Sequence, residues 1–127
     1  MRYTILLAVI AAVAGGGPLS AHHSYAGFDM TPTTVEGRVE VLKIANPHTL
    51  IEIRGDDDQR YVVVWSAING LVRRGLVVIG GPESLQEILK PGTRITVTGR
   101  LKRENSGIAM LPQTIDVPSH GQIWGPR

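Results

Sequence analysis

Hydrophobic and polar residues alternate one by one along residues 35–41, a pattern that predicts a β-strand with one buried face and one wet face. Two similar runs follow. The first covers residues 49–54, after the turn signal Asn46-Pro47, and the second covers residues 60–65, after an acidic turn that starts at Gly55. Runs of this kind, separated by short turn sequences, predict three consecutive strands.

The alternation stops between residues 66 and 92, where short helices are expected instead. Ser66 is a candidate N-cap for a helix through Arg74 that ends at Gly75. Pro82 and Glu83 are typical of the first turn of a second helix, which would run to residue 89 or 90 before Pro91-Gly92. The sequence therefore predicts a helical insertion after the third strand.

Two more strands complete the pattern. Residues 94–102 alternate clearly, and residues 108–117 form a last strand interrupted by Pro112. Three strands, a helical insertion and two strands within about 85 residues are typical of an all-β fold with small helical content, the five-stranded Greek-key barrel of the OB-fold type. Closure would remove the exposed strand edges. An open β-sandwich is the alternative.

The N-terminus has the three parts of a secretory signal: Arg2, an apolar run over residues 5–14, and small residues up to Ala21. Ten apolar residues would rise about 15 Å as a helix, half of a bilayer core, so no permanent membrane span is expected. We expect cleavage near Ala21 and a periplasmic or secreted protein. The predicted organisation is a signal peptide (1–21), an N-terminal arm (22–33), an OB-like barrel domain (34–117) and a C-terminal tail (118–127).

The composition and charge of the chain exclude several kinds of functional site and partner. The chain has no cysteine, which excludes disulfides, thiolate metal sites and a cysteine nucleophile. The formal charge of +2 includes Arg2, which would leave with the signal. A nearly neutral chain offers no field to recruit nucleic acid, so we expect no nucleic-acid partner.

The four histidines are the candidate metal ligands. Cleavage after Ala21 would make His22 the first residue, and its α-amine and imidazole could chelate one ion. A second imidazole, preferably that of His48 with His120 in reserve, would give a three-nitrogen site that suits copper, with zinc or nickel as alternatives. Cleavage one residue earlier would place His23 third, in a square-planar site. The opposing interpretation is a solvated arm and an ordinary turn histidine.

Other residues suggest chemistry less strongly. Asp56, Asp57 and Asp58 lack the spacing of a calcium loop and are expected to form a solvated hairpin tip. The basic residues of the fourth strand are expected to form a solvated face. Met110 is expected in the core rather than as a copper ligand. Ser119 beside His120 is not expected to act as a nucleophile with its base, because adjacent residues rarely orient correctly.

The sequence resembles an uncharacterised family of exported bacterial proteins. The resemblance rests on the segments 21–25 (Ala-His-His-Ser-Tyr), 36–39 (Glu-Gly-Arg-Val), 46–48 (Asn-Pro-His), 69–75 (Asn-Gly-Leu-Val-Arg-Arg-Gly) and 89–99. The sequence departs from the family at Tyr25, where the family usually has phenylalanine. The segment 76–81 is also longer and more apolar than the corresponding segment of the family. The resemblance implies a periplasmic domain but no reaction.

These observations predict a small exported binding protein rather than an enzyme. The first hypothesis is a carrier or accessory protein that binds copper through His22 and His48, with His23 or His120 assisting. The second is a module that binds an oligosaccharide, a metabolite or a periplasmic partner protein on the barrel surface. An oxidative copper enzyme is the least favoured alternative.

Overall fold

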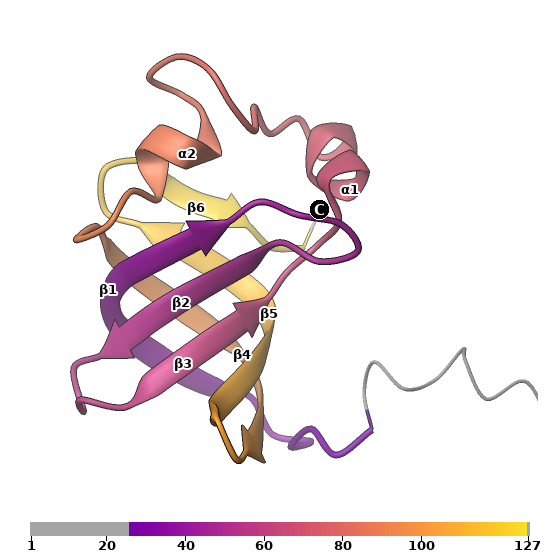
Figure 1. The fold of residues 1–127 in the computed structure, drawn as a ribbon, viewed down its shortest axis with the longest axis vertical. Helices are drawn as coiled ribbons and strands as arrows, with labels where there is room; N and C mark the ends of the chain where they lie inside the picture. Colours follow the sequence, from indigo (N-terminus) through magenta and orange to yellow (C-terminus); the bar gives the residue numbers. More distant parts are fainter. Residues whose placement is uncertain (1–25, 127) are drawn as a thin grey trace, which may run out of the picture.

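The barrel is closed by a parallel pairing between its third and fifth strands. The structure is a computed structural model and describes residues 26–126 (Figure 1). Its strands follow the order β3-β2-β1-β4-β5-β6. The elements are β1 (Thr33–Lys43), β2 (Leu50–Gly55), β3 (Arg60–Val64), α1 (Ile68–Arg73), α2 (Leu85–Ile88), β4 (Arg94–Glu104), β5 (Gly107–Val117) and β6 (Gly121–Trp124).

Strand β1 lies at the centre of the sheet and pairs antiparallel with both β2 and β4. The seam joins β3 to β5, where Tyr61 faces Ile108 and Val63 faces Met110. The first five strands thus form one closed barrel, which confirms the predicted fold class. Strands that close on themselves leave no long free edge, which explains how a small all-β domain avoids edge-to-edge association.

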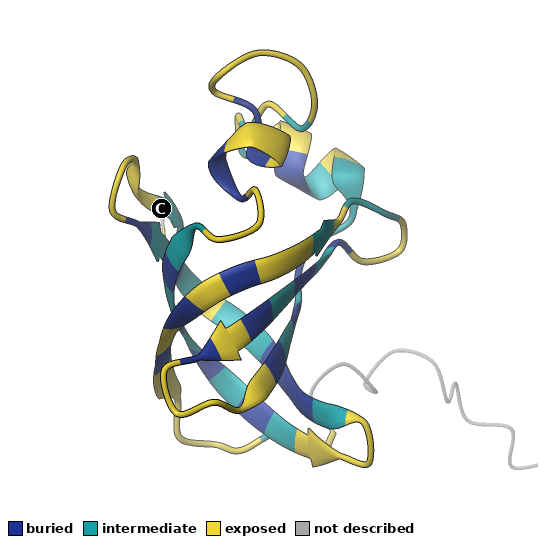
Figure 2. Cartoon of the chain, turned by 60° about the vertical axis from the view of Figure 1, so that its left-hand side comes forward, coloured by how far each residue is buried: buried dark blue, intermediate teal, exposed yellow. Residues whose placement is uncertain are grey.

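The barrel interior is filled by the apolar members of the alternating runs. Buried and exposed residues alternate along β1 and β4, as Figure 2 shows. Met110 is fully buried, as expected, and Tyr61 and Trp65 lie on the buried face of β3 and its continuation. Helix α2 covers one end of the barrel and contributes Leu85 and Ile88 to the core.

Two glycines allow the strands to coil tightly. A Cβ atom at Gly37 would lie 2.2 Å from the Arg54 carbonyl oxygen, and one at Gly99 would lie 2.1 Å from the Leu111 carbonyl oxygen. Both atoms belong to neighbouring backbone, which cannot move aside without breaking the sheet. These positions therefore accept only glycine, because the strands approach one another too closely for a side chain.

Both helices are shorter than expected. Ser66 does not cap α1; Ala67 occupies the N-cap, and the Ile68 N–H donates instead to Asn46 Oδ1 at 3.0 Å. The Asn-Pro-His turn thus supplies the cap from a distant part of the chain. Helix α2 begins at Leu85, because Ser84 rather than Pro82 precedes its first turn and accepts a hydrogen bond from the Glu87 N–H.

A sixth strand lies in the segment that the sequence pattern assigned to a tail. Trp124 of β6 pairs with Ile115, and Gly121 pairs with Val117. Four residues are too few to show a clear alternation, which is why the pattern did not reveal β6. No helix within residues 26–126 is long and apolar enough to span a membrane.

Candidate functional site

A hollow of about 600 Å³ opens on the barrel wall where β3 ends beside β5. Its lining comes from the end of β3 and the residues after it, from the middle of β4 and β5, and from β6. The lining residues are Val64, Trp65, Ser66, Arg100, Leu111, Pro112, Gln113 and Trp124.

The hollow lies where one strand ladder ends and the neighbouring ladder is irregular. The parallel pairing of β3 with β5 ends at Val63 and Met110. Two residues later, Pro112 brings a backbone nitrogen without a proton, and the register between β4 and β5 shifts between Thr98 and Gly99. Beyond Met110, β3 and β5 are therefore no longer paired, and Trp124 of β6 joins the lining of the hollow there.

The two tryptophans of the chain meet at this hollow. Their ring centroids are 5.4 Å apart with an interplanar angle of 88°, an edge-to-face contact. The Arg74 guanidinium carbon lies 4.4 Å from the centroid of the Trp124 ring, and its Nη2 donates to the Gly125 carbonyl. These contacts fix Trp124 against both Trp65 and the residue that follows α1.

Trp65 has an unsatisfied hydrogen-bond donor. Its side chain is 3% exposed, and its Nε1 is the buried side-chain polar atom that lacks a partner among residues 26–126. An unpaired buried donor costs about 1–3 kcal/mol. This N–H has almost no accessible surface, so its cost is a local feature of the wall, and the part of Trp65 that lines the hollow is counted only as aromatic surface.

The polar groups of the hollow are few. Ser66, Arg100 and Gln113 interrupt an otherwise apolar and aromatic lining. Arg100 is half-buried, and within the part of the chain that the structure describes its side chain forms no ion pair or hydrogen bond. An apolar concavity with a small number of polar groups is the usual form of a small-molecule site.

His48 contacts the backbone of Trp65, one of the residues that line the hollow. Its Nδ1 is 3.2 Å from the Trp65 carbonyl oxygen, and its side chain is exposed at the turn between β1 and β2. A carbonyl oxygen can only accept, so Nδ1 carries the proton in the neutral ring and the lone pair is on Nε2. This is the arrangement in which histidine binds a metal or accepts a proton.

The other candidate histidines are not gathered around His48. His120 has its Nδ1 2.7 Å from Ser119 Oγ and its Nε2 3.4 Å from Glu83 Oε2, all at exposed positions. His22 and His23 lie outside the described residues. From residue 26 to 126, no group of three or more His, Cys, Asp or Glu residues could hold a metal ion.

Residues 26–32, which precede β1, and the β1–β2 turn lie at opposite ends of the barrel (Figure 1). The Asp29 N–H donates to the Leu101 carbonyl at 2.8 Å, beyond the start of β1. From there β1 spans 11 residues toward His48, about 33 Å at the usual rise. The chain from Asp29 back to His22 covers at most about 25 Å when fully extended. Even fully extended, that stretch is shorter than β1, so an ion shared by His22 and His48 would also need both imidazole side chains to span the remaining distance.

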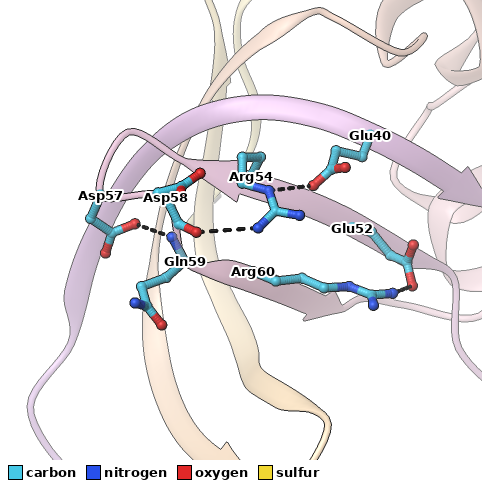
Figure 3. Close-up of polar contacts among 7 residues, drawn as sticks. All are labelled: Glu40, Glu52, Arg54, Asp57, Asp58, Gln59 and Arg60. Atoms are coloured by element: carbon cyan, nitrogen blue, oxygen red, sulfur yellow. Dashed lines mark hydrogen bonds and ion pairs between the residues drawn. The ribbon is translucent and has the colours of Figure 1, made fainter.

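The acidic hairpin between β2 and β3 is held by internal pairs (Figure 3). Asp57 accepts from the Gln59 N–H at 3.0 Å and from the Tyr61 hydroxyl at 2.6 Å, and Arg54 Nη1 donates to the Asp58 carbonyl. The Tyr61 hydrogen bond lowers the pKa of Asp57, while burial and then that same bond raise the pKa of Tyr61 to about 12.

The third member of the acidic triplet is also engaged. Asp56 makes a two-point contact with Arg94, at 2.6 and 2.9 Å, and this hydrogen bonding lowers the pKa of Asp56. Asp56 and Asp57 therefore bind side chains of β4 and β3 from the hairpin. The hairpin is exposed, as expected, but its carboxylates hold the turn and the barrel end together.

A sequence model of one protein family matches residues 9–110 of the chain, from the apolar N-terminal segment to the middle of β5. The chain belongs to DUF6152, a family of unknown function. This confirms the resemblance to an uncharacterised family. No curated protein matches the chain.

Sequence reasoning did not find the hollow. Trp65 stood at the end of the third predicted strand, Trp124 in the supposed tail, and Arg100 among basic residues expected to face solvent. One signal was present: Trp65 ends a β-like run, and Pro112 interrupts the strand predicted over residues 108–117. That these features meet could not be read from their spacing.

Proposed function

We propose that this DUF6152 protein is an exported binding protein, without enzymatic activity, that holds a small ligand in the hollow around Trp65 and Trp124. The observation that carries the proposal is the hollow itself, an apolar concavity in which the two tryptophans meet beside a few polar side chains. The volume of about 600 Å³ falls within the usual range for ligand sites. Export rests on the N-terminal sequence pattern and a cut near Ala21.

The two indole N–H groups provide the test, because the chain holds two tryptophans and both line the hollow. We expect ¹⁵N NMR of the exported protein, titrated with a set of naphthalene, indole and pyranose compounds, to show saturable shifts of both indole signals. The proposal fails if none of these compounds shifts the indole signals below about 10 mM.

A matched pair of variants locates the binding. Gln113→Trp places a large ring at the rim of the hollow and should abolish the shifts, because Gln113 is an exposed lining residue. Gln59→Trp adds the same ring at the β2–β3 hairpin, at the other end of the barrel, and should leave them unchanged. Equal effects of the two variants would contradict binding in the hollow.

Copper binding is the second candidate, supported by the orientation of His48. Its Nδ1–H donates to the Trp65 carbonyl, which leaves Nε2 free as a ligand. The remaining ligands would be the terminal amine and imidazole of His22, with His23 or His120 assisting. It ranks second because the arm leaves the barrel at the end opposite His48, and because His120 already contacts Glu83.

Intact mass of the exported protein with and without copper reports both the processing site and metal loading. The proposed site predicts a chain that starts at His22 and takes up one ion, with tighter binding in calorimetry than in the His48→Ala and His22→Ala single variants. Unchanged affinity in His48→Ala would remove the turn from the site. Zinc and nickel serve as comparison ions.

A further inference from the structure

The ligand class can be inferred from the single cation of the hollow, in an argument that rests on the proposed function. We propose that the hollow takes an organic anion with an aromatic or branched apolar body, whose carboxylate binds the Arg100 guanidinium. Four observations support this: the unpaired state of Arg100, its half-buried position, its place in the lining and the apolar character of the residues around it.

Arg100 differs from three neighbouring cations on the barrel wall, each of which has an acidic partner. Arg54 pairs with Glu40, Arg94 with Asp56, and Lys102 with Glu104. Arg100 lies between Arg94 and Lys102 on the same outward face of β4, yet has no such partner among residues 26–126. A half-buried guanidinium without an anion is a site where an anionic group would bind with little competition.

The surroundings of Arg100 select the rest of the ligand. Leu111 is its direct neighbour across the β4–β5 ladder, and Pro112 follows. With Val64 and the two indole rings they form a surface that gains from covering by an apolar or planar group. A bare inorganic anion would pair with Arg100 but leave this apolar surface exposed to water. A carboxylate on a ring or branched chain would pair with Arg100 and also cover the apolar surface.

Gln113 and Ser66 add hydrogen-bonding side chains to the same hollow. They suit a ligand with a second polar group, such as a keto or hydroxyl oxygen on the apolar body. The guanidinium fork matches the two oxygens of a carboxylate, so Arg100 sets the orientation of the ligand.

The test compares 2-naphthoate with its neutral amide, 2-naphthamide, followed by the indole signals of the exported protein. In the wild-type protein we expect naphthoate to bind about tenfold or more tightly than naphthamide, because a hydrogen-bonded charge pair outweighs a neutral contact. Acetate alone should bind weakly. Arg100→Gln should remove the preference for naphthoate while naphthamide affinity stays the same.

Arg103→Gln is the matched control, since Arg103 is an exposed arginine of the same strand and lies outside the hollow. It should leave naphthoate binding unchanged at constant ionic strength. Arg100→Lys, which keeps the charge without the fork, should give an intermediate affinity. Thermal unfolding of each variant confirms that it folds.

The outcomes separate the two proposals. Equal affinity for naphthoate and naphthamide, an equal loss in Arg100→Gln and Arg103→Gln, or binding of a pyranose alone would overturn the anion assignment while leaving a ligand site in the hollow. Failure of every compound to shift the indole signals would overturn both.

Discussion

Trp65 and Trp124 meet edge to face, with ring centroids 5.4 Å apart, and this contact joins the end of β3 to the last strand of the chain. Trp65 is buried, whereas Trp124 remains partly exposed at the hollow. The guanidinium of Arg74 covers the Trp124 ring and holds the following carbonyl. One aromatic pair thus stabilises the C-terminal strand and shapes the candidate site.

Trp124→Leu should destabilise the protein by about 1–2 kcal/mol, because it removes the aromatic contact and the cation–π contact while keeping an apolar side chain. Urea unfolding followed by circular dichroism measures the change. Trp124→Phe, which keeps an aromatic ring, should cost less. If both variants lose the same stability, the aromatic contacts contribute nothing beyond apolar burial.

Gly99→Ala should be among the most damaging substitutions in the barrel, with a loss of about 3 kcal/mol or more. Its Cβ would lie 2.1 Å from the Leu111 carbonyl oxygen, so the β4–β5 ladder must open to admit it. Chemical unfolding gives the value. Thr96→Ala, at an outward position of the same strand, is the control and should change stability by less than about 1 kcal/mol.

Tyr61 should make the protein sensitive to alkali. Its pKa rises from 10.0 to about 12 in the folded state, mainly through burial. The stabilisation is therefore complete below pH 10 and is lost as pH rises from 10 toward 12, because the unfolded chain ionises first. Absorbance at 295 nm should show one late-titrating tyrosine that Tyr61→Phe removes. An ordinary titration of every tyrosine would contradict the hydrogen-bonded, buried phenol.

Asp57 should make the stability of the protein sensitive to acid, whereas Tyr61 makes it sensitive to alkali. The hydrogen bonds from Tyr61 and the Gln59 N–H lower its pKa in the folded state. Its contribution is present above the unfolded pKa and is lost as pH falls through the folded value. Asp57→Asn keeps an acceptor but not the charge, so the variant should show a flatter fall in unfolding free energy below about pH 4. Asp58→Asn, at the same turn, is the control.

The barrel strands were predictable because buried and exposed residues alternate within each strand, so the pattern is visible in a short stretch of sequence. In β1 and β4 every second side chain faces the core, so the inward set appears in the sequence as a period of two. The helix boundaries were less accurate. The Ile68 N–H takes its partner from Asn46, a contact that no pattern near residue 68 contains.

The sequence by itself determined the first five strands along the chain, the buried face of the clearly alternating ones, and the histidines and acidic turn that needed explanation. Only the tertiary structure decided which of these residues meet. Trp65, Arg100 and Trp124 come from three distant segments, and they share one hollow because the β3–β5 ladder ends where Pro112 interrupts β5 and β6 returns beside it. Local patterns report whether a residue is buried, but the neighbours of a residue depend on how the closed barrel brings its strands together.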